Sequence, residues 1–484
     1  MGSRGARRRK WLLPLLVALL VLKPLVALGQ DSPPRGPRDR PSAPSADPGQ
    51  PTTEPPEVVP QPLPAPPPPT VPSVAPPLFP TRPAGHPPAA TFDLQPSLTL
   101  SEEYSDNFKL QPRDRQENFR TSLTPGLTLF INSPFTTGVL NYALSVSHDS
   151  SSESLSLFHL LLAQVAWQAT PRLRFSASDA FTRGDEPTQA DRLHLRSERR
   201  TFTSNVFAID SDQLFGTIAT REYYRLSTFF NEGGSDTNSH TIGSSVSVPF
   251  YQVNTALLGY EYLTSDTSGG SEITGHQFTG SLTRQIAALS GGIAAGYAFR
   301  SQPGSDVNQD GRTNVDFQIW NGSLFGAYVR GPWSLNGSVG VGGVRTDSGK
   351  EIGPLVTTMA GLSYAFARGT ARLEGDRGFS ETFTTGENFG VVKTQGVTAS
   401  YSHSFTSAVA VGVSAFYREN EFTGVGGGTA GESASIWGGT LGSSLQLSRR
   451  VTVNFLYSYI ERVATPRETS YTENLARVSL AVKF

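Results

Sequence analysis

Residues 473–484 read ENLARVSLAVKF, and their side chains alternate between apolar and polar almost without exception. One face carries Ala476, Val478, Leu480, Val482 and Phe484, and the other carries Glu473, Arg477, Ser479, Ala481 and Lys483, with Leu475 as the exception. Successive side chains of a β-strand point to opposite faces, so the pattern predicts a strand with one apolar and one polar wall. Such a strand, closing on an aromatic residue, is typical of the last strand of a transmembrane β-barrel. A soluble two-sheet protein could also end on an alternating strand, so the decision rests on the rest of the chain.

The composition narrows the class of protein. The 484 residues could hold several domains or one large barrel. Only 17% of them are charged, compared with about 25% in soluble globular proteins. The absence of Cys excludes disulfides and thiolate metal sites. The net charge of −1 gives no overall attraction to nucleic acid, so we expect no nucleic-acid partner.

The first residues have the pattern of an export signal. Arg4, Arg7, Arg8, Arg9 and Lys10 precede an apolar run over residues 11–28, and Ala27-Leu28-Gly29 offers small residues for cleavage before Gln30. This order predicts a signal peptide over residues 1–29. A single anchoring helix is the alternative, but Lys23 and Pro24 leave the run shorter than the roughly 20 apolar residues that such a helix needs.

Residues 30–90 are dominated by Pro, most densely at residues 66–69. Pro has no N–H group and a fixed backbone angle, so this stretch is expected to form neither helix nor sheet. We predict a disordered periplasmic tether rich in polyproline II conformation. It is interpreted as a spacer, with docking to a periplasmic partner or to peptidoglycan as the alternative.

From residue 91 to residue 484 the chain alternates apolar and polar residues in segments of roughly ten, separated by turn residues. Strand-like examples cover residues 139–147, 173–182, 253–262, 409–416 and 451–459. About 20 segments (18–22) can be distinguished, each long enough for a tilted strand to span a membrane. The fold class predicted is therefore all-β, a transmembrane antiparallel up-and-down β-barrel, preceded by the disordered Pro-rich segment.

The connections between these segments differ at their two ends. Tight connections at residues 132–134, 170–171, 211–212, 367–369 and 448–449 alternate with long ones at 106–117, 184–197, 302–313 and 419–433. Short turns on one side and long loops on the other are typical of barrels in the outer membrane of Gram-negative bacteria. An even strand number places both the N- and the C-terminus on the short-turn, periplasmic side.

Aromatic residues recur beside the predicted short turns, at Phe135, Phe250, Tyr251, Trp333, Phe366, Phe405 and Phe484. Amphipathic rings at one level around a barrel form a girdle at the membrane interface. Ordinary core packing in a soluble barrel is the alternative. The girdle predicts contact with outer-membrane lipid and lipopolysaccharide.

Charged residues at positions predicted to face inward are the candidate pore-lining residues: Arg221, Arg225, Arg372, Glu374, Asp376, Glu473, Arg477 and Lys483. Simple solvation explains polar residues in any water-filled lumen. Facing rows of opposite charge would in addition create a transverse field that tunes the selectivity of a pore.

Two loops carry other candidate sites. Residues 306–314 resemble the first half of a calcium-binding loop, with Asp306, Asn308 and Asp310 as candidate metal ligands, although Phe317 stands where a bidentate Glu belongs. A basic run, interpreted as a solvated loop with contact to an anionic polymer or lipopolysaccharide as the alternative, comprises Arg192, His194, Arg196, Arg199 and Arg200.

No catalytic residues are predicted, and an enzyme is not expected. The His residues, at positions 86, 148, 159, 194, 240, 276 and 403, lack metal-ligand spacing, and no Gly-x-Ser-x-Gly or His-Glu-x-x-His motif occurs. No cofactor is predicted beyond the calcium candidate. Catalytic groups on barrel strands need no local motif, so a surface enzyme stays open as a third function.

Residues 92–107 read FDLQPSLTLSEEYSDN. This stretch resembles the opening strand of outer-membrane proteins of the β-barrel porin 2 type, which begin on such a pattern and end on an aromatic residue. The resemblance implies a porin-like barrel, and members of that family are often associated with exopolysaccharide export. Likeness to outer-membrane proteins also implies that Phe484 is a recognition signal for the barrel-assembly machinery.

The function predicted is an aqueous channel for passive passage of solutes, since about 16–18 strands already enclose a channel. A non-autonomous component of an exopolysaccharide export or surface-assembly system is the alternative. A gated receptor of the TonB type is disfavoured, because no folded plug domain precedes the strands and the strand number is low.

Overall fold

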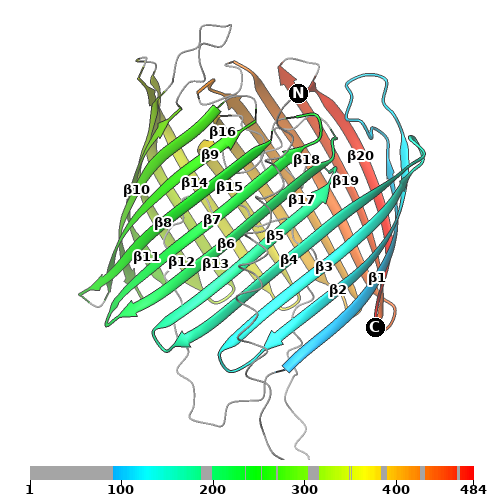
Figure 1. The fold of residues 1–484 in the computed structure, drawn as a ribbon, viewed down its shortest axis with the longest axis horizontal. Helices are drawn as coiled ribbons and strands as arrows, with labels where there is room; N and C mark the ends of the chain where they lie inside the picture. The colour runs from blue at the N-terminus through cyan, green and yellow to red at the C-terminus, as the bar shows by residue number, and fades with distance from the viewer. Residues whose placement is uncertain are drawn as a thin grey trace, which may run out of the picture. The chain divides into compact units, whose positions relative to one another are not determined.

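The computed structural model describes residues 91–186, 199–234, 236–251, 253–268, 271–302, 316–347, 349, 351–382, 390–425, 431–465 and 469–484. Within these ranges the chain forms a single antiparallel sheet of 20 strands (Figure 1). No helix in these ranges is long and apolar enough to cross a membrane.

The strands follow one another around the barrel in chain order. They are β1 (Thr91–Ser105), β2 (Asn118–Asn132), β3 (Thr136–Asp149), β4 (Ser154–Thr170), β5 (Leu173–Gly184), β6 (Phe202–Phe215), β7 (Ile218–Asn231), β8 (Thr237–Phe250), β9 (Asn254–Thr267), β10 (Ser271–Ile286), β11 (Leu289–Ser301), β12 (Phe317–Arg330), β13 (Trp333–Thr346), β14 (Glu351–Phe366), β15 (Gly369–Glu381), β16 (Val391–Ser404), β17 (Val409–Phe422), β18 (Ser433–Gln446), β19 (Val451–Thr465) and β20 (Tyr471–Lys483).

The sheet is closed by the first and last strands. β1 pairs with β20 from Ser97 opposite Lys483 to Ser105 opposite Leu475, and the backbone N–H of Phe484 donates to the carbonyl oxygen of Pro96 at 3.0 Å. Full closure leaves no unpaired sheet edge between β1 and β20. The predicted all-β barrel of about 20 strands is confirmed.

The register assigns each strand residue to the outside or the inside of the barrel, because directly opposite residues share a face. Leu100 of β1 stands opposite Leu480 of β20, and both side chains are exposed on the outside. Leu475, the exception in the alternating pattern, points inward and is buried. The outward face is therefore apolar and the inward face largely polar.

The two ends of the barrel carry different connections. At one end no connection between strands exceeds four residues, whereas the other end carries the long connections at residues 106–117, 185–201, 302–316 and 423–432. We name these the short-turn end and the long-loop end. The start of β1 and Phe484 both lie at the short-turn end (Figure 1).

One predicted turn is wrong. Ser211 and Asp212 lie inside β6, and the chain turns after Phe215, at Gly216, whose φ is +64°. Gly tolerates this left-handed conformation without steric cost. Ser and Asp favour turns in water, but in a barrel strand a polar side chain can instead face the interior, as Asp212 does opposite Arg221.

Aromatic side chains form two rows on the outward face. All seven residues of the predicted row beside the short turns are exposed. A second exposed row lies from the middle of the strands into their long-loop half and comprises Tyr142, Tyr260, Tyr297, Tyr417, Trp437 and Tyr457. The outward face between the rows exposes aliphatic side chains such as Leu258, Ile293 and Val339.

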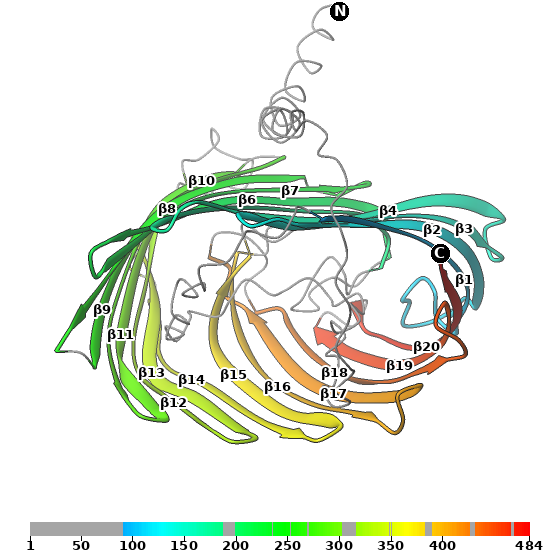
Figure 2. The same ribbon diagram turned by 90° about the horizontal axis from the view of Figure 1, so that it is seen from below.

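Seen along the barrel, the wall is uneven in curvature. Figure 2 shows a flattened side, formed by β4 to β8, opposite a curved side that continues through β11 to β19. The inward residues of these two sides supply most of the candidate functional groups.

Candidate functional site in the barrel interior

The flattened side carries a charged cluster on its inward face. Arg221 of β7 binds two carboxylates of β6, with Nη2 2.6 Å from Oδ1 of Asp210 and Nε 3.8 Å from Oδ1 of Asp212. Half of the Arg221 side chain, 50%, is nevertheless exposed. Arg225 lies over the ring of Tyr223, with 4.8 Å between its Cζ atom and the ring centroid.

Tyr223 extends this cluster to β9, where its hydroxyl donates to Glu261 at 2.7 Å. Gly243 of β8 makes this reach possible, because a Cβ built at Gly243 would overlap the Tyr223 ring. The ring therefore lies on the backbone of β8, and the charged cluster extends over four neighbouring strands.

The curved side carries a second cluster. Arg418 of β17 binds Asp376 of β15 across 3.0 Å, and Arg372 lies 3.7 Å from Glu374 on β15 itself. The side chains of Arg372 and Glu374 are each 58% exposed. In both clusters opposite charges alternate along one wall, so acid and base neutralise each other locally.

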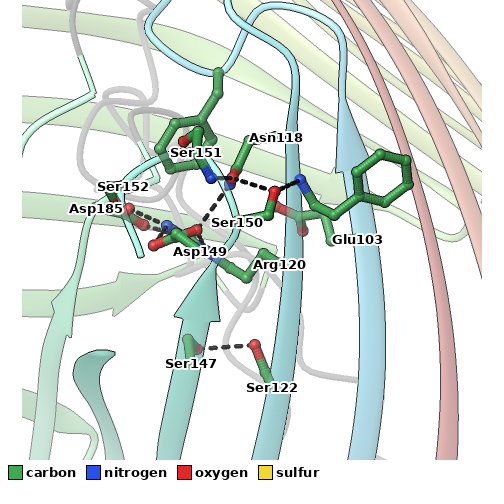
Figure 3. Close-up of polar contacts among 12 residues, drawn as sticks. Glu103, Asn118, Arg120, Ser122, Ser147, Asp149, Ser150, Ser151, Ser152 and Asp185 are labelled. Carbon is green, nitrogen blue, oxygen red and sulfur yellow. Dashed lines mark hydrogen bonds and ion pairs between the residues drawn. The ribbon is translucent and has the colours of Figure 1, made fainter. Parts of the chain in front are cut away.

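A third cluster lies inside the long-loop end and is packed. Arg120 of β2 sits between Asp149 of β3 and Asp185, the residue that follows β5, at 2.7 and 2.6 Å (Figure 3). Its guanidinium also lies over the rings of Phe108 and Phe158, 4.9 and 5.3 Å from their centroids. The loop residues Phe108 and Asp185 are thereby held against the inner wall.

Arg199 holds the same loops to the last strand. Its guanidinium binds Glu186 and Glu473, each at 2.9 Å, and its Nε donates to the carbonyl oxygen of Phe108 at 2.9 Å. The side chain is only 3% exposed. The interpretation of the basic run as a solvated loop is therefore wrong for Arg199, because its ion-pair partners lie inside the barrel mouth.

The other members of the basic run differ. Arg200 is half-buried and donates to the carbonyl oxygen of Gly233 at 3.1 Å. Arg192, His194 and Arg196 lie outside the described residues.

Charge is retained in this packed cluster through its ion pairs. Burial would raise the pKa of Asp185, but the hydrogen bonds and positive charge of Arg120, together with Arg199, lower it below its usual range. Burial opposes the charge of Arg199, but Glu186, Glu473 and Asp185 raise its pKa above the ordinary value. Opposite charges thus outweigh desolvation in both groups.

The remaining predicted site residues are placed as follows. Arg477 binds Glu103, so an ion pair joins the first and last strands on the inward face. Lys483 lies at the short-turn end, opposite Ser97. The calcium candidates Asp306, Asn308 and Asp310 lie outside the described residues.

Three His residues have a common partner that their spacing in the sequence did not predict. His159, His240 and His276 each hydrogen-bond through Nδ1 to a Tyr hydroxyl at 2.8 to 3.0 Å, namely that of Tyr142, Tyr224 and Tyr260. The pairs lie on the outward face, where such a bond satisfies polar groups without water. Among the described residues no cluster of three or more His, Cys, Asp or Glu could hold a metal ion.

Comparisons with known proteins give only distant likenesses. No family model and no curated protein matches the chain. Among solved structures, the siderophore receptor PirA from Acinetobacter baumannii aligns over 81% of each chain at 10% identity, with a TM-score of 0.47.

Two further structures align over 81% of this chain and 99% of their own. They are OpdK from Pseudomonas aeruginosa, crystallised with vanillate, at 11% identity and TM-score 0.41, and a BenF-like porin from Pseudomonas fluorescens Pf-5, at 9% identity and TM-score 0.36. Likenesses this distant assign no function to the chain.

Proposed function

We propose that this chain is an outer-membrane, porin-like barrel that forms an aqueous channel for passive passage of hydrophilic solutes. One observation carries the proposal: charged side chains on the inward face remain accessible to solvent. Arg221 is 50% exposed, and Arg372 and Glu374 are each 58% exposed. A packed interior would bury such groups, and removing each ion from water would cost on the order of several kcal/mol.

The outward face supports insertion in a membrane. Exposed aliphatic side chains between two aromatic rows form a band that would be costly to expose to water and is favourable in lipid. In the proposed orientation the short turns face the periplasm, together with both termini and the Pro-rich segment over residues 30–90. Lipid, lipopolysaccharide and the barrel-assembly machinery are the partners that this location implies.

The long-loop end supplies the narrowest part of the proposed channel. Phe108, Asp185 and Arg199 belong to connections between strands, yet their contacts lie on the inner wall. Loops fixed inside the mouth reduce its width, so we expect passage to depend on solute size.

Liposome swelling with neutral sugars of increasing size tests the proposal. Liposomes containing the folded protein should swell fast with small sugars and slowly with large ones. Swelling at the rate of protein-free liposomes would contradict autonomous passage and favour a component of an export or assembly system. Deleting residues 31–88 tests this alternative function as a component of an export or assembly system. In that case the shortened protein should no longer bind its periplasmic partner, while liposome swelling stays unchanged.

A further inference from the structure

The barrel wall divides in its long-loop half between β14 and β15. Their pairing runs from Phe366 opposite Gly369 up to Thr358 opposite Arg377 and stops there. Above this point β14 stays paired with β13, and β15 stays paired with β16. Pro354, in the part of β14 that is not paired with β15, has no N–H group to donate to a neighbouring strand.

A groove of about 370 Å³ lies where the two strands separate. It is lined by the outward-facing residues Thr358, Ala360, Gly375, Arg377, Val397 and Tyr417, with Gln395 and the neighbouring Asp376 and Gly396. Ala360, Gly375, Val397 and Tyr417 follow one another in one row of the sheet, and we call the small Ala360 and Gly375 the floor of the groove and the larger Val397 and Tyr417 its wall. The lining is mainly apolar, as expected for a surface that holds a hydrocarbon chain.

Arg377 supplies a cationic group at one side of the groove. Its side chain is exposed, and within the described part of the chain it makes no ion pair or hydrogen bond. The neighbouring outward groups are already engaged: Lys393 binds Glu421 at 2.7 Å, and Gln395 donates to Glu419 at 2.5 Å. Arg377 is therefore the groove residue whose charge is available to a ligand.

The position of Arg377 favours an anionic ligand. Arg377 lies in the long-loop half of β15, four residues before Glu381, the end of the strand. The cost of placing an Arg on the lipid face is high at the centre of a bilayer and falls steeply towards the interface. At the interface a phosphate group can accept charge-assisted hydrogen bonds from it.

We propose that this groove binds an anionic membrane lipid, with the phosphate on Arg377 and one acyl chain along the floor at Ala360 and Gly375. The site rests on the membrane insertion that the proposed function includes, but not on conduction of solutes. Two kinds of variant separate the contributions of the lipid head group and of its acyl chain to binding.

Arg377→Gln removes the charge, and Gly375→Leu fills the floor. A Cβ at Gly375 would approach only the carbonyl oxygen of Gly396, at 3.5 Å, so the larger side chain can be added without displacing the backbone. The matched controls are Arg284→Gln on β10 and Gly322→Leu on β12, two outward positions away from the groove. A Cβ at Gly322 would meet nothing within 4 Å.

Native mass spectrometry measures binding to the full-length protein, which is released from a neutral detergent. Either phosphatidylglycerol or phosphatidylcholine is added, and the two lipids have identical acyl chains. We expect one phosphatidylglycerol to bind preferentially, with affinity about tenfold lower in Arg377→Gln and in Gly375→Leu. Arg377→Lys should retain most of the binding, and both controls should match the parent. Heat-modifiable migration in gels verifies that every variant is a folded barrel.

Equal binding of the two lipids, or unchanged binding in folded Gly375→Leu, would overturn the proposal. If inorganic phosphate displaced phosphatidylglycerol at an equal concentration, the proposal would also be overturned, because the acyl chains of the lipid would then contribute nothing to binding. Bilayer recording of the same preparations separates this site from the channel: a protein that binds the lipid but never conducts would overturn the proposed function alone.

Discussion

Arg199 and Glu473 form an ion pair of 2.9 Å although 274 positions of the sequence separate them. Their side chains are 3% and 5% exposed, and the hydroxyl of Ser105 donates to the same Glu473 oxygen at 2.7 Å. A connection between β5 and β6 is thereby fixed to the last strand beside the seam with the first. We infer that this contact sets the width of the channel at the long-loop end.

Replacing Glu473 by Gln should release the loop that carries Arg199. Removing both partners' compensation from a buried charge costs about 3–5 kcal/mol, and the loss of Glu473 alone should cost less because Arg199 keeps its ion pair with Glu186. We expect a larger and noisier single-channel conductance and a lower temperature for the gel-shift transition of the folded barrel.

Lys393→Gln is the matched control for this variant. Lys393 and Glu421 form a pair on the outward face with side chains 33% and 57% exposed, and exposed pairs contribute about 0–1 kcal/mol. We expect Lys393→Gln to change the conductance and the thermal transition very little. If Glu473→Gln changed them equally little, the pair of Arg199 and Glu473 would not hold the loop.

The ionic selectivity of the channel should be weak and adjustable at the flattened side. Arg221 binds Asp210 and Asp212 on the same wall, so the native cluster exposes little net charge. The double variant Asp210→Asn and Asp212→Asn should shift the reversal potential in a salt gradient towards anions, and Arg221→Gln should shift it towards cations. A shift in the same direction for both would show that these residues do not line the conducting path.

The contribution of Asp185 to stability should disappear in acid. Its pKa is lowered in the folded barrel by Arg120, so its stabilising effect is present above the unfolded pKa of about 3.9 and is lost as the pH falls through the folded value. Urea unfolding at several pH values measures the free energy of unfolding of the parent and of Asp185→Asn. The difference between the two should be constant between pH values of about 7 and 5 and should shrink below about pH 4. A difference that already shrinks between about 7 and 5 would contradict the lowered pKa.

Deleting Phe484 should reduce the amount of assembled barrel more than it changes conductance. The residue is 66% exposed, so its removal takes little packing from the folded barrel, while the backbone bond to Pro96 is a single contact at the seam. Membrane fractionation measures assembly and bilayer recording measures the channel. Normal amounts of the shortened protein in the membrane would show that assembly does not depend on this residue.

The alternating pattern predicted the strands well because burial on one face repeats every second residue. The strand from Val451, for example, begins where the pattern placed it and ends at Thr465, six residues beyond the predicted end at Tyr459. A turn was wrongly predicted at Ser211 and Asp212, and the turn at Gly216 was missed, because turn propensity in water does not account for an inward-facing polar residue.

The contacts of the interior could not be predicted in the same way. Arg199 was interpreted as solvated because its partner Glu473 is distant in the sequence, and only the closure of the sheet brings them together. The groove at Arg377 likewise depends on where the ladder between β14 and β15 stops. A Gly-Pro pair within a strand is a sequence signal for such an interruption.

Planar-bilayer recording of the purified, folded full chain tests the central claim most directly. A water-filled barrel narrowed at one end predicts discrete conductance steps at neutral pH, enlarged in Glu473→Gln. Repeated insertion of protein that is folded by its heat-modifiable migration, without any conductance step in either the parent or the variant, would contradict the account.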